Sequence, residues 1–99
     1  MRLKISPFAL TDLEESIEYY NLEKQNLGNE FAKIVNSTFE RIKENPNQFP
    51  KEYKEMRKAK TERFSFNVFF VSSEKFGYVL GIFHSGRDPK TIKDRYKMI

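Results

Sequence analysis

The sequence contains no cysteine and only one histidine among its 99 residues, so disulfides and structural zinc sites are excluded. Its four glycines form no glycine-rich phosphate loop, and its serines lack the context of a nucleophile elbow. The longest apolar runs, Val68–Val71 and Tyr78–Leu80, have the length of strands and not of membrane helices. We therefore expect no metal, no cofactor and no membrane segment.

The remaining composition is that of a soluble globular protein, with 38% hydrophobic and 32% charged residues. The length predicts one domain, residues 1–99, because a chain of this size buries a single core. Residues 1–7 lack the continuous apolar region of a signal peptide, so we expect a cytoplasmic protein.

The net charge of +4 is unevenly distributed along the chain. Residues 1–50 contain six Lys and Arg against eight Asp and Glu, whereas residues 51–99 contain twelve against six. A positive surface is therefore expected on the second half, which suits nucleic acid, a ribonucleoprotein or an acidic protein. A basic surface that binds nothing is the alternative interpretation.

Two helices are predicted in the first half. After a short strand at residues 2–6, Ser6-Pro7 is typical of a helix start, and apolar residues then recur at helical spacing to about residue 24. A break at residues 26–29 precedes a second amphipathic helix that Asn45-Pro46 ends. The short break predicts an antiparallel helical hairpin.

Strands are predicted in the second half. Residues 53–60 alternate as a single strand, with Tyr53, Glu55, Arg57 and Ala59 on one face. Further strands are expected at residues 65–72 and 76–84, joined by a turn at 73–75, and residues 91–98 favour a short terminal helix.

These elements predict an α+β fold of order β-α-α-β-β-β. We expect an antiparallel sheet of about four strands, with the N-terminal helical hairpin packed on one face. The other face is then open to solvent or to a partner, and the basic residues of the second half should surround it.

The basic half offers a set of residues suited to phosphate chemistry. Cleavage of RNA by a ribose 2′-OH needs two proton transfers and cations to stabilise the phosphorane, so His84 or Tyr96 and the neighbouring cations are candidates. The candidate residues are Lys54, Arg57, Lys58, Lys60, Arg63, His84, Arg87, Arg95 and Tyr96.

Each candidate also has a structural interpretation. In this interpretation His84 only holds the turn that begins at Ser85, and Tyr96 only closes the edge of the sheet. Arg57 is then expected to pair with Glu55, whose carboxylate is a candidate general base or simply a surface acid.

Several short motifs, in this order and spacing, resemble the RelE/ParE superfamily of toxins from bacterial type II toxin–antitoxin systems. They are Ser6-Pro7-x-Ala9-x-x-Asp12-Leu13, Tyr19-Tyr20, Ile42-x-x-x-Pro46-x-x-Phe49-Pro50, Arg57, Phe64-Ser65-Phe66-x-Val68-Phe69-Phe70 and Ile82-Phe83-His84-Ser85-Gly86-Arg87-Asp88-Pro89. The last two motifs are more similar to the ParE-like branch, and the superfamily fold is the one that the periodicity predicts.

The resemblance implies a toxin that inhibits growth and is neutralised by a cognate antitoxin, as in plasmid stabilisation systems. A ParE-like toxin binds DNA gyrase, and a RelE-like toxin is an mRNA interferase that cleaves mRNA on the ribosome. An inactive toxin-fold protein that only binds its antitoxin is the third interpretation. We expect an antitoxin helix or extended segment to contact the hairpin or the sheet and to meet the basic rim with acidic residues.

Residue roles differ between these interpretations. As an endoribonuclease, the protein would use Arg57 and Arg63 for phosphate, His84 or Tyr96 for proton transfer and Arg87 for the transition state. As a gyrase inhibitor it has no catalytic residue. Residues expected to bind a target or nucleic acid are Lys54, Arg57, Lys58, Lys60, Arg87 and Arg95.

Overall fold

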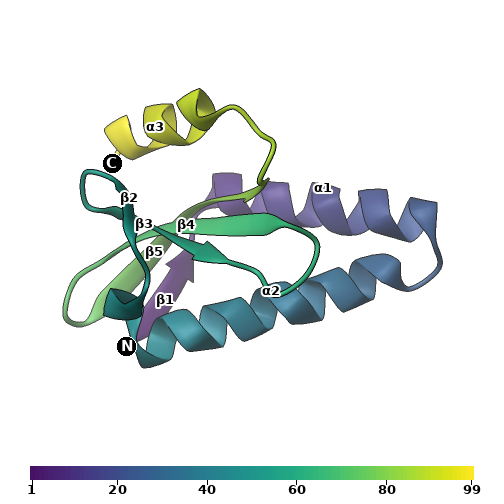
Figure 1. Ribbon diagram of the computed structural model, residues 1–99, viewed down its shortest axis with the longest axis horizontal. Coiled ribbons are helices and arrows are strands. Elements are labelled where there is room, and N and C mark those ends of the chain that lie inside the picture. The colour runs from purple at the N-terminus through teal and green to yellow at the C-terminus, as the bar shows by residue number, and fades with distance from the viewer.

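The computed structural model describes residues 1–99 and contains three α-helices, a 3₁₀ turn and five strands (Figure 1). None of the helices combines the length and apolar character needed to cross a membrane. The elements are β1 (Arg2–Ile5), α1 (Pro7–Glu23), α2 (Leu27–Glu44), η1 (Pro46–Gln48), β2 (Lys51–Tyr53), β3 (Met56–Lys60), β4 (Phe66–Ser72), β5 (Phe76–His84) and α3 (Pro89–Lys97).

The α+β class, the helical hairpin and the short terminal helix are confirmed, but the sheet is larger than predicted. It has five strands in the order β1-β5-β4-β3-β2. Neighbouring strands are antiparallel except β1, which pairs with β5 in parallel. The first strand, β1, therefore lies beside the last strand, β5, although two helices and three strands separate them in the sequence.

The predicted single strand at residues 53–60 is instead a tight hairpin of β2 and β3. Lys54 adopts a left-handed backbone, with φ of 52°, and the chain reverses at Lys54 and Glu55. This turn removes Tyr53 from the face of Ala59 and packs it against the opposite face of the sheet. Within β3 itself the predicted alternation holds, because Met56 and Ala59 are buried in different clusters.

The strand predicted from residue 65 begins at Phe66 because the two preceding residues turn the chain. Phe64 and Ser65 both have positive φ, 72° and 53°. The Thr61 hydroxyl organises this loop, since it donates to the Arg63 carbonyl at 2.5 Å and accepts from the Phe66 amide at 3.2 Å. This turn places the Phe64 ring against the apolar cluster between the helical hairpin and the sheet.

The hairpin helices approach closely at Gly28, the second residue of α2. A Cβ built there lies 2.1 Å from the Ile17 carbonyl oxygen, so only glycine fits without displacing the backbone of α1. The Gly28 amide donates to the Asn21 side chain at 2.8 Å. Asn26, in the left-handed region with φ of 67°, turns the chain just before this contact.

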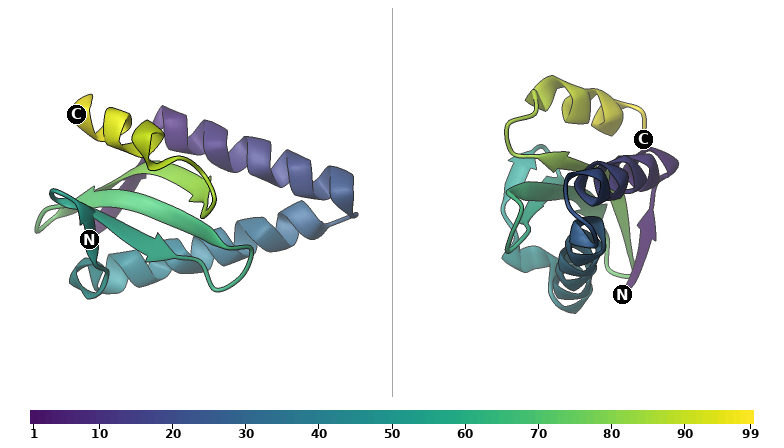
Figure 2. Two further views of the ribbon diagram at one scale, coloured as in Figure 1. Left: turned by 45° about the horizontal axis from the view of Figure 1, so that its top comes forward. Right: turned by 90° about the vertical axis from the view of Figure 1, so that its right-hand side faces the viewer.

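Two apolar clusters form on opposite faces of the sheet. The larger contains Phe31, Val35 and Ile42 of α2 with inward residues of the strands, and the smaller contains Met56, Leu80 and Ile92. Figure 2 shows α2 on one side of the sheet and α3 on the other. The hairpin therefore packs on one face, as predicted.

The second face is not open, which corrects the expectation of a free sheet surface. Ile92 of α3 is only 2% exposed and packs against Phe69, Leu80 and Phe83. Asp88 caps this helix by accepting from the Lys90 amide at 2.9 Å, and Pro89 occupies the first turn. Any site on this face is consequently a groove beside α3.

Replacing Ser6 with alanine should lower the free energy of unfolding by about 1 kcal/mol. The Ser6 hydroxyl is buried and accepts from the Ala9 amide at 3.0 Å, so the substitution leaves an N–H at the start of α1 without its cap. Urea denaturation followed by circular dichroism measures the change. Ser73→Ala, at an exposed turn, is the matched control; equal losses for both variants would contradict this role for the cap.

Candidate functional site

A buried ion pair links α1 to α3 at the edge of the sheet. The Arg95 guanidinium contacts both oxygens of the Asp12 carboxylate, at 2.6 and 3.1 Å, and the two side chains are 15% and 9% exposed. Arg95 also donates to the Leu80 carbonyl at 3.0 Å. Arg95, predicted to bind a target, is thus engaged in holding the fold together.

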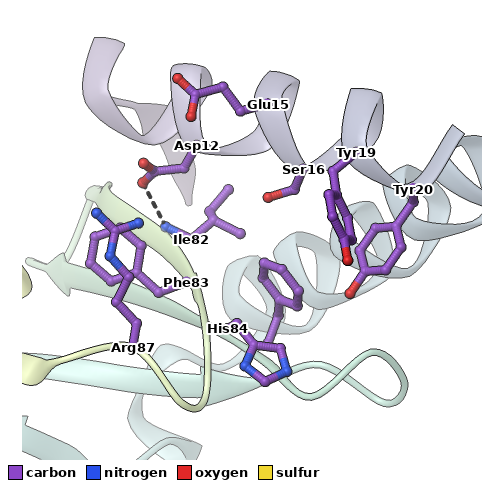
Figure 3. A pocket seen from close by; sticks show the side chains of 10 residues that line it. Asp12, Glu15, Ser16, Tyr19, Tyr20, Ile82, Phe83, His84 and Arg87 are labelled. Carbon is purple, nitrogen blue, oxygen red and sulfur yellow. Dashed lines mark hydrogen bonds between the residues drawn. The ribbon is translucent and has the colours of Figure 1, made fainter. Parts of the chain in front are cut away.

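The same carboxylate contacts β5 directly. Asp12 Oδ2 accepts from the Ile82 amide at 3.0 Å, as the dashed line in Figure 3 shows. Asp12 and Arg95 together bind the backbone of β5 where no neighbouring strand is present. The sequence motif that contains Asp12 therefore has a structural role in fixing α1 and α3 to β5.

A groove of about 440 Å³ lies beside this ion pair, between α1 and the end of β5. Figure 3 shows Tyr19 and Tyr20 projecting into it from α1, with His84 and Arg87 on the opposite side. Its lining residues are Asp12, Glu15, Ser16, Tyr19, Tyr20, Phe66, Ile82, Phe83, His84 and Arg87. We call it the α1–β5 groove.

A second groove, of about 310 Å³, lies on the α3 face and shares His84 and Arg87 with the first. It brings these residues together with Lys58 of β3 and Lys93 of α3. We call it the α3 groove. Three of the predicted candidates, Lys58, His84 and Arg87, therefore lie in one groove although β3 and β5 are separated by β4.

Asn67 is a lining residue of the α3 groove that sequence reasoning missed. Its side chain is buried, and its Oδ1 atom has no hydrogen-bond partner. A polar residue within the apolar run of β4 was the available signal. An unpaired buried acceptor is costly, and this oxygen lies below the surface of the groove, where a ligand does not reach it.

His84 ends β5 and supports the turn that follows. Its Nδ1 accepts from the Gly86 amide at 3.1 Å, and its backbone carbonyl accepts from the Arg87 amide at 3.0 Å. The structural interpretation of His84 is therefore borne out in its geometry. The ring remains exposed and packs edge-on against Phe66, with Nε2 free for a partner.

Arg87 follows this turn with its guanidinium 4.3 Å from the centre of the Phe83 ring. It forms no salt bridge with any carboxylate of the chain. In Figure 3 its side chain extends over Phe83 toward α1. Arg87 is consequently an exposed, preoriented cation between the two grooves.

Arg57 and Arg63 lie away from both grooves. Arg57 donates to the Phe49 carbonyl at 2.5 Å and contacts Asn47 at 3.4 Å, so it ties β3 to the loop after α2. The predicted pair of Arg57 with Glu55 is absent, because Glu55 pairs with Lys51 at 2.9 Å. Arg63 lies in the β3–β4 loop, 3.7 Å from Glu30 of α2.

Three of the remaining candidates, Tyr96, Lys54 and Lys58, lie around the β2–β3 hairpin. Tyr96 packs edge-on against Tyr53, with ring centres 5.6 Å apart, and thus joins α3 to this hairpin. Lys54 lies over the Tyr53 ring at 5.4 Å, and Lys58 pairs with Glu52 at 3.3 Å. Lys60, at the other end of β3, is exposed.

The pKa values of two side chains, Glu55 and Tyr20, are shifted from their ordinary values. A hydrogen bond from Lys51, together with its charge, lowers the pKa of the exposed Glu55 carboxyl. A lowered pKa weakens a general base, so Glu55 is poorly suited to that role. Burial raises the pKa of Tyr20, and Tyr19 raises it further, so the Tyr20 hydroxyl stays protonated.

Comparison with known proteins identifies the fold. Protein-family models and curated sequences give no match. A chain of the solved structure described as "Chromosomal ParDE TA system from P. aeruginosa" superposes with a TM-score of 0.75 and is 22% identical in sequence. The alignment covers 85% of this chain and 95% of that chain. The ParE-like fold implied by the sequence motifs is therefore confirmed.

Proposed function

We propose that this chain is the toxin of a type II toxin–antitoxin pair and that it inhibits growth by binding DNA gyrase. Two independent observations support the toxin assignment: the ordered sequence motifs, and the fold shared with a chain of a ParDE system. The two agree although the sequence identity is only 22%. Neutralisation by a cognate antitoxin belongs to the same proposal.

We favour gyrase binding over RNA cleavage because the candidate catalytic residues are dispersed over the structure. Arg57 is engaged by the Phe49 carbonyl, Arg63 lies near Glu30 on the hairpin side, and Tyr96 packs on Tyr53. Proton transfer and phosphorane stabilisation require groups that converge on one phosphate. A dispersed basic surface suits recognition of a large partner better than it suits catalysis.

The surface proposed to bind the target is centred on Arg87 and the β2–β3 hairpin. Arg87 has no acidic partner within the chain. Lys54, in the turn before β3, and Lys60, the last residue of β3, are both exposed. Arg95 is excluded from this surface because Asp12 and Leu80 occupy its guanidinium. Arginine is one of the residues that most often contribute strongly to binding at protein interfaces.

Ribosome-dependent mRNA cleavage is the second candidate function, and the α3 groove is the observation that favours it. The groove holds His84 and Arg87 together with Lys58 and Lys93. On this alternative His84 is the proton-transfer residue and Arg87 the transition-state cation. Tyr96 would have to leave Tyr53 to contribute.

Two assays on the purified protein discriminate the candidates. We expect inhibition of gyrase-catalysed supercoiling, with Arg87→Ala weakening inhibition about 10-fold or more if Arg87 is an interface anchor. We expect mRNA on programmed ribosomes to remain intact. Lys75→Ala, at the exposed β4–β5 turn, is the matched charge-removal control and should inhibit like the unmodified protein.

The outcomes separate all three interpretations. Cleavage of mRNA that Arg87→Ala and Tyr96→Phe abolish, with supercoiling unaffected, would establish the endoribonuclease and refute gyrase binding. Normal growth after induction, together with binding to the protein encoded by a neighbouring reading frame, would indicate the inactive toxin-fold protein. The absence of such a reading frame and of growth arrest would refute the toxin assignment itself.

A further inference from the structure

The parallel pairing of β1 with β5 ends before β5 does. The last paired residues are Ile5 and Val79, after which the chain turns into α1 at Ser6. The antiparallel pairing of β5 with β4 continues to His84. The segment from Leu80 to His84 therefore has a strand on one side only, and its other edge faces the α1–β5 groove.

Side chains bind the first part of this edge in place of a strand. Arg95 donates to the Leu80 carbonyl at 3.0 Å, and Asp12 accepts from the Ile82 amide at 3.0 Å. Toward β4, the Ser85 amide donates to the carbonyl of Ser65, the residue before that strand, at 2.8 Å. Since backbone groups alternate along a strand, the Ile82 carbonyl and the His84 amide point to the same edge as the Ile82 amide.

These two groups have the spacing that one residue of a parallel strand requires. In a parallel ladder, a residue donates its N–H to the carbonyl of one partner residue and accepts from the amide two residues further on. A residue opposite Phe83 would therefore bond the Ile82 carbonyl and the His84 amide. An antiparallel strand would instead bond both backbone groups of one residue, and neither Ile82 nor His84 has both free: Asp12 accepts from the Ile82 amide, and the His84 carbonyl accepts from the Arg87 amide.

We propose that a short extended segment of the antitoxin adds to this edge as a parallel strand, continuing the line of β1. The inference rests on the proposed function for the identity of the partner. In this arrangement one antitoxin residue lies opposite Phe83, donates its amide to the Ile82 carbonyl and accepts from the His84 amide. Addition of a strand to a sheet edge is a general mode of peptide recognition.

The walls of the groove define the side chains that such a segment must carry. Tyr20 and Phe66 form an aromatic wall, with ring centres 6.1 Å apart, and offer contact to an apolar side chain. Arg87, which lacks an acidic partner in the chain, offers a contact to a carboxylate. The segment therefore combines an apolar residue with an acidic one.

Amide hydrogen exchange of the His84 N–H tests the proposed strand. The probe is the protein encoded by the reading frame adjacent to this chain's gene, bound to the isotope-labelled full chain. We expect the His84 amide to exchange at least tenfold more slowly in the complex than in the free chain. Equal exchange rates in a complex that forms and neutralises growth arrest would overturn the strand while leaving the proposed function intact.

A bulky substitution in the groove provides an independent test. Ser16 lines the α1–β5 groove, so Ser16→Trp should raise the dissociation constant of the adjacent protein at least tenfold in calorimetry. Thr11→Trp, on an exposed position of α1 that lines neither groove, should change it less than twofold. Equal affinities for both variants would overturn the placement. Failure of the unmodified chain to bind or be neutralised would refute the proposed function.

Discussion

Replacing Asp12 with alanine should lower the free energy of unfolding by about 3–5 kcal/mol, because it leaves a largely buried arginine without its counterion. The side chains of Asp12 and Arg95 are 9% and 15% exposed and share two contacts. The substitution also removes the acceptor of the Ile82 amide. Urea denaturation monitored by circular dichroism gives the difference.

Two controls isolate the ion pair. Glu14→Ala removes an exposed carboxylate from the same helix and should change stability by less than about 0.5 kcal/mol. The double variant Asp12→Leu with Arg95→Met removes both charges and should recover part of the loss, because no buried charge is left unpaired, although the Ile82 amide and the Leu80 carbonyl lose their partners. A loss below about 1 kcal/mol for Asp12→Ala would contradict a locking role for this pair.

The helices were predictable because their signals are local. Ser6-Pro7 starts α1 as expected, with the hydroxyl cap in place, and Asn45 ends α2 as its proline neighbour requires. Apolar residues at helical spacing on α2 lie in the core. Capping and periodicity depend on residues three or four positions apart, so one sequence contains all the information needed.

The sheet was less predictable because two of its features depend on distant partners. Alternation over residues 53–60 fits one strand, but the left-handed backbone at Lys54 divides it into two. A lysine at that position gives no turn signal, unlike glycine or asparagine. The parallel pairing of β1 follows from which edge of the sheet is vacant, and periodicity contains no information about that.

The candidate site was partly predictable for the same reason. His84 and Arg87 are close in sequence and line the same grooves. Arg95 reads as an exposed cation in a charged helix, and its burial depends on Asp12, 83 positions away. Asn67 stands out in the sequence as a polar residue within an apolar run, but only the surrounding strands show that its Oδ1 atom is buried and unpaired. Sequence therefore identifies the basic segment, and tertiary structure decides which cations remain free.

The largest effect on the hairpin core is expected for Phe31→Ala, which should lower the free energy of unfolding by about 3–5 kcal/mol. Phe31 is fully buried, and its ring centre lies 5.2 Å from that of Tyr20 and 4.6 Å from that of Phe66. These two rings form the aromatic wall of the α1–β5 groove. Denaturation with urea measures the loss.

Phe76→Ala is the matched control, since this ring is 48% exposed at the start of β5 and the same atoms are removed. Its loss should stay below about 1 kcal/mol because little apolar surface returns to water. If Phe31 supports the groove, Phe31→Ala should also weaken antitoxin binding at temperatures where the variant remains folded, whereas Phe76→Ala should not. Equal stability losses at the two positions would show that the cavity left at Phe31 collapses. Unchanged antitoxin binding by Phe31→Ala would show that Phe31 does not support the α1–β5 groove.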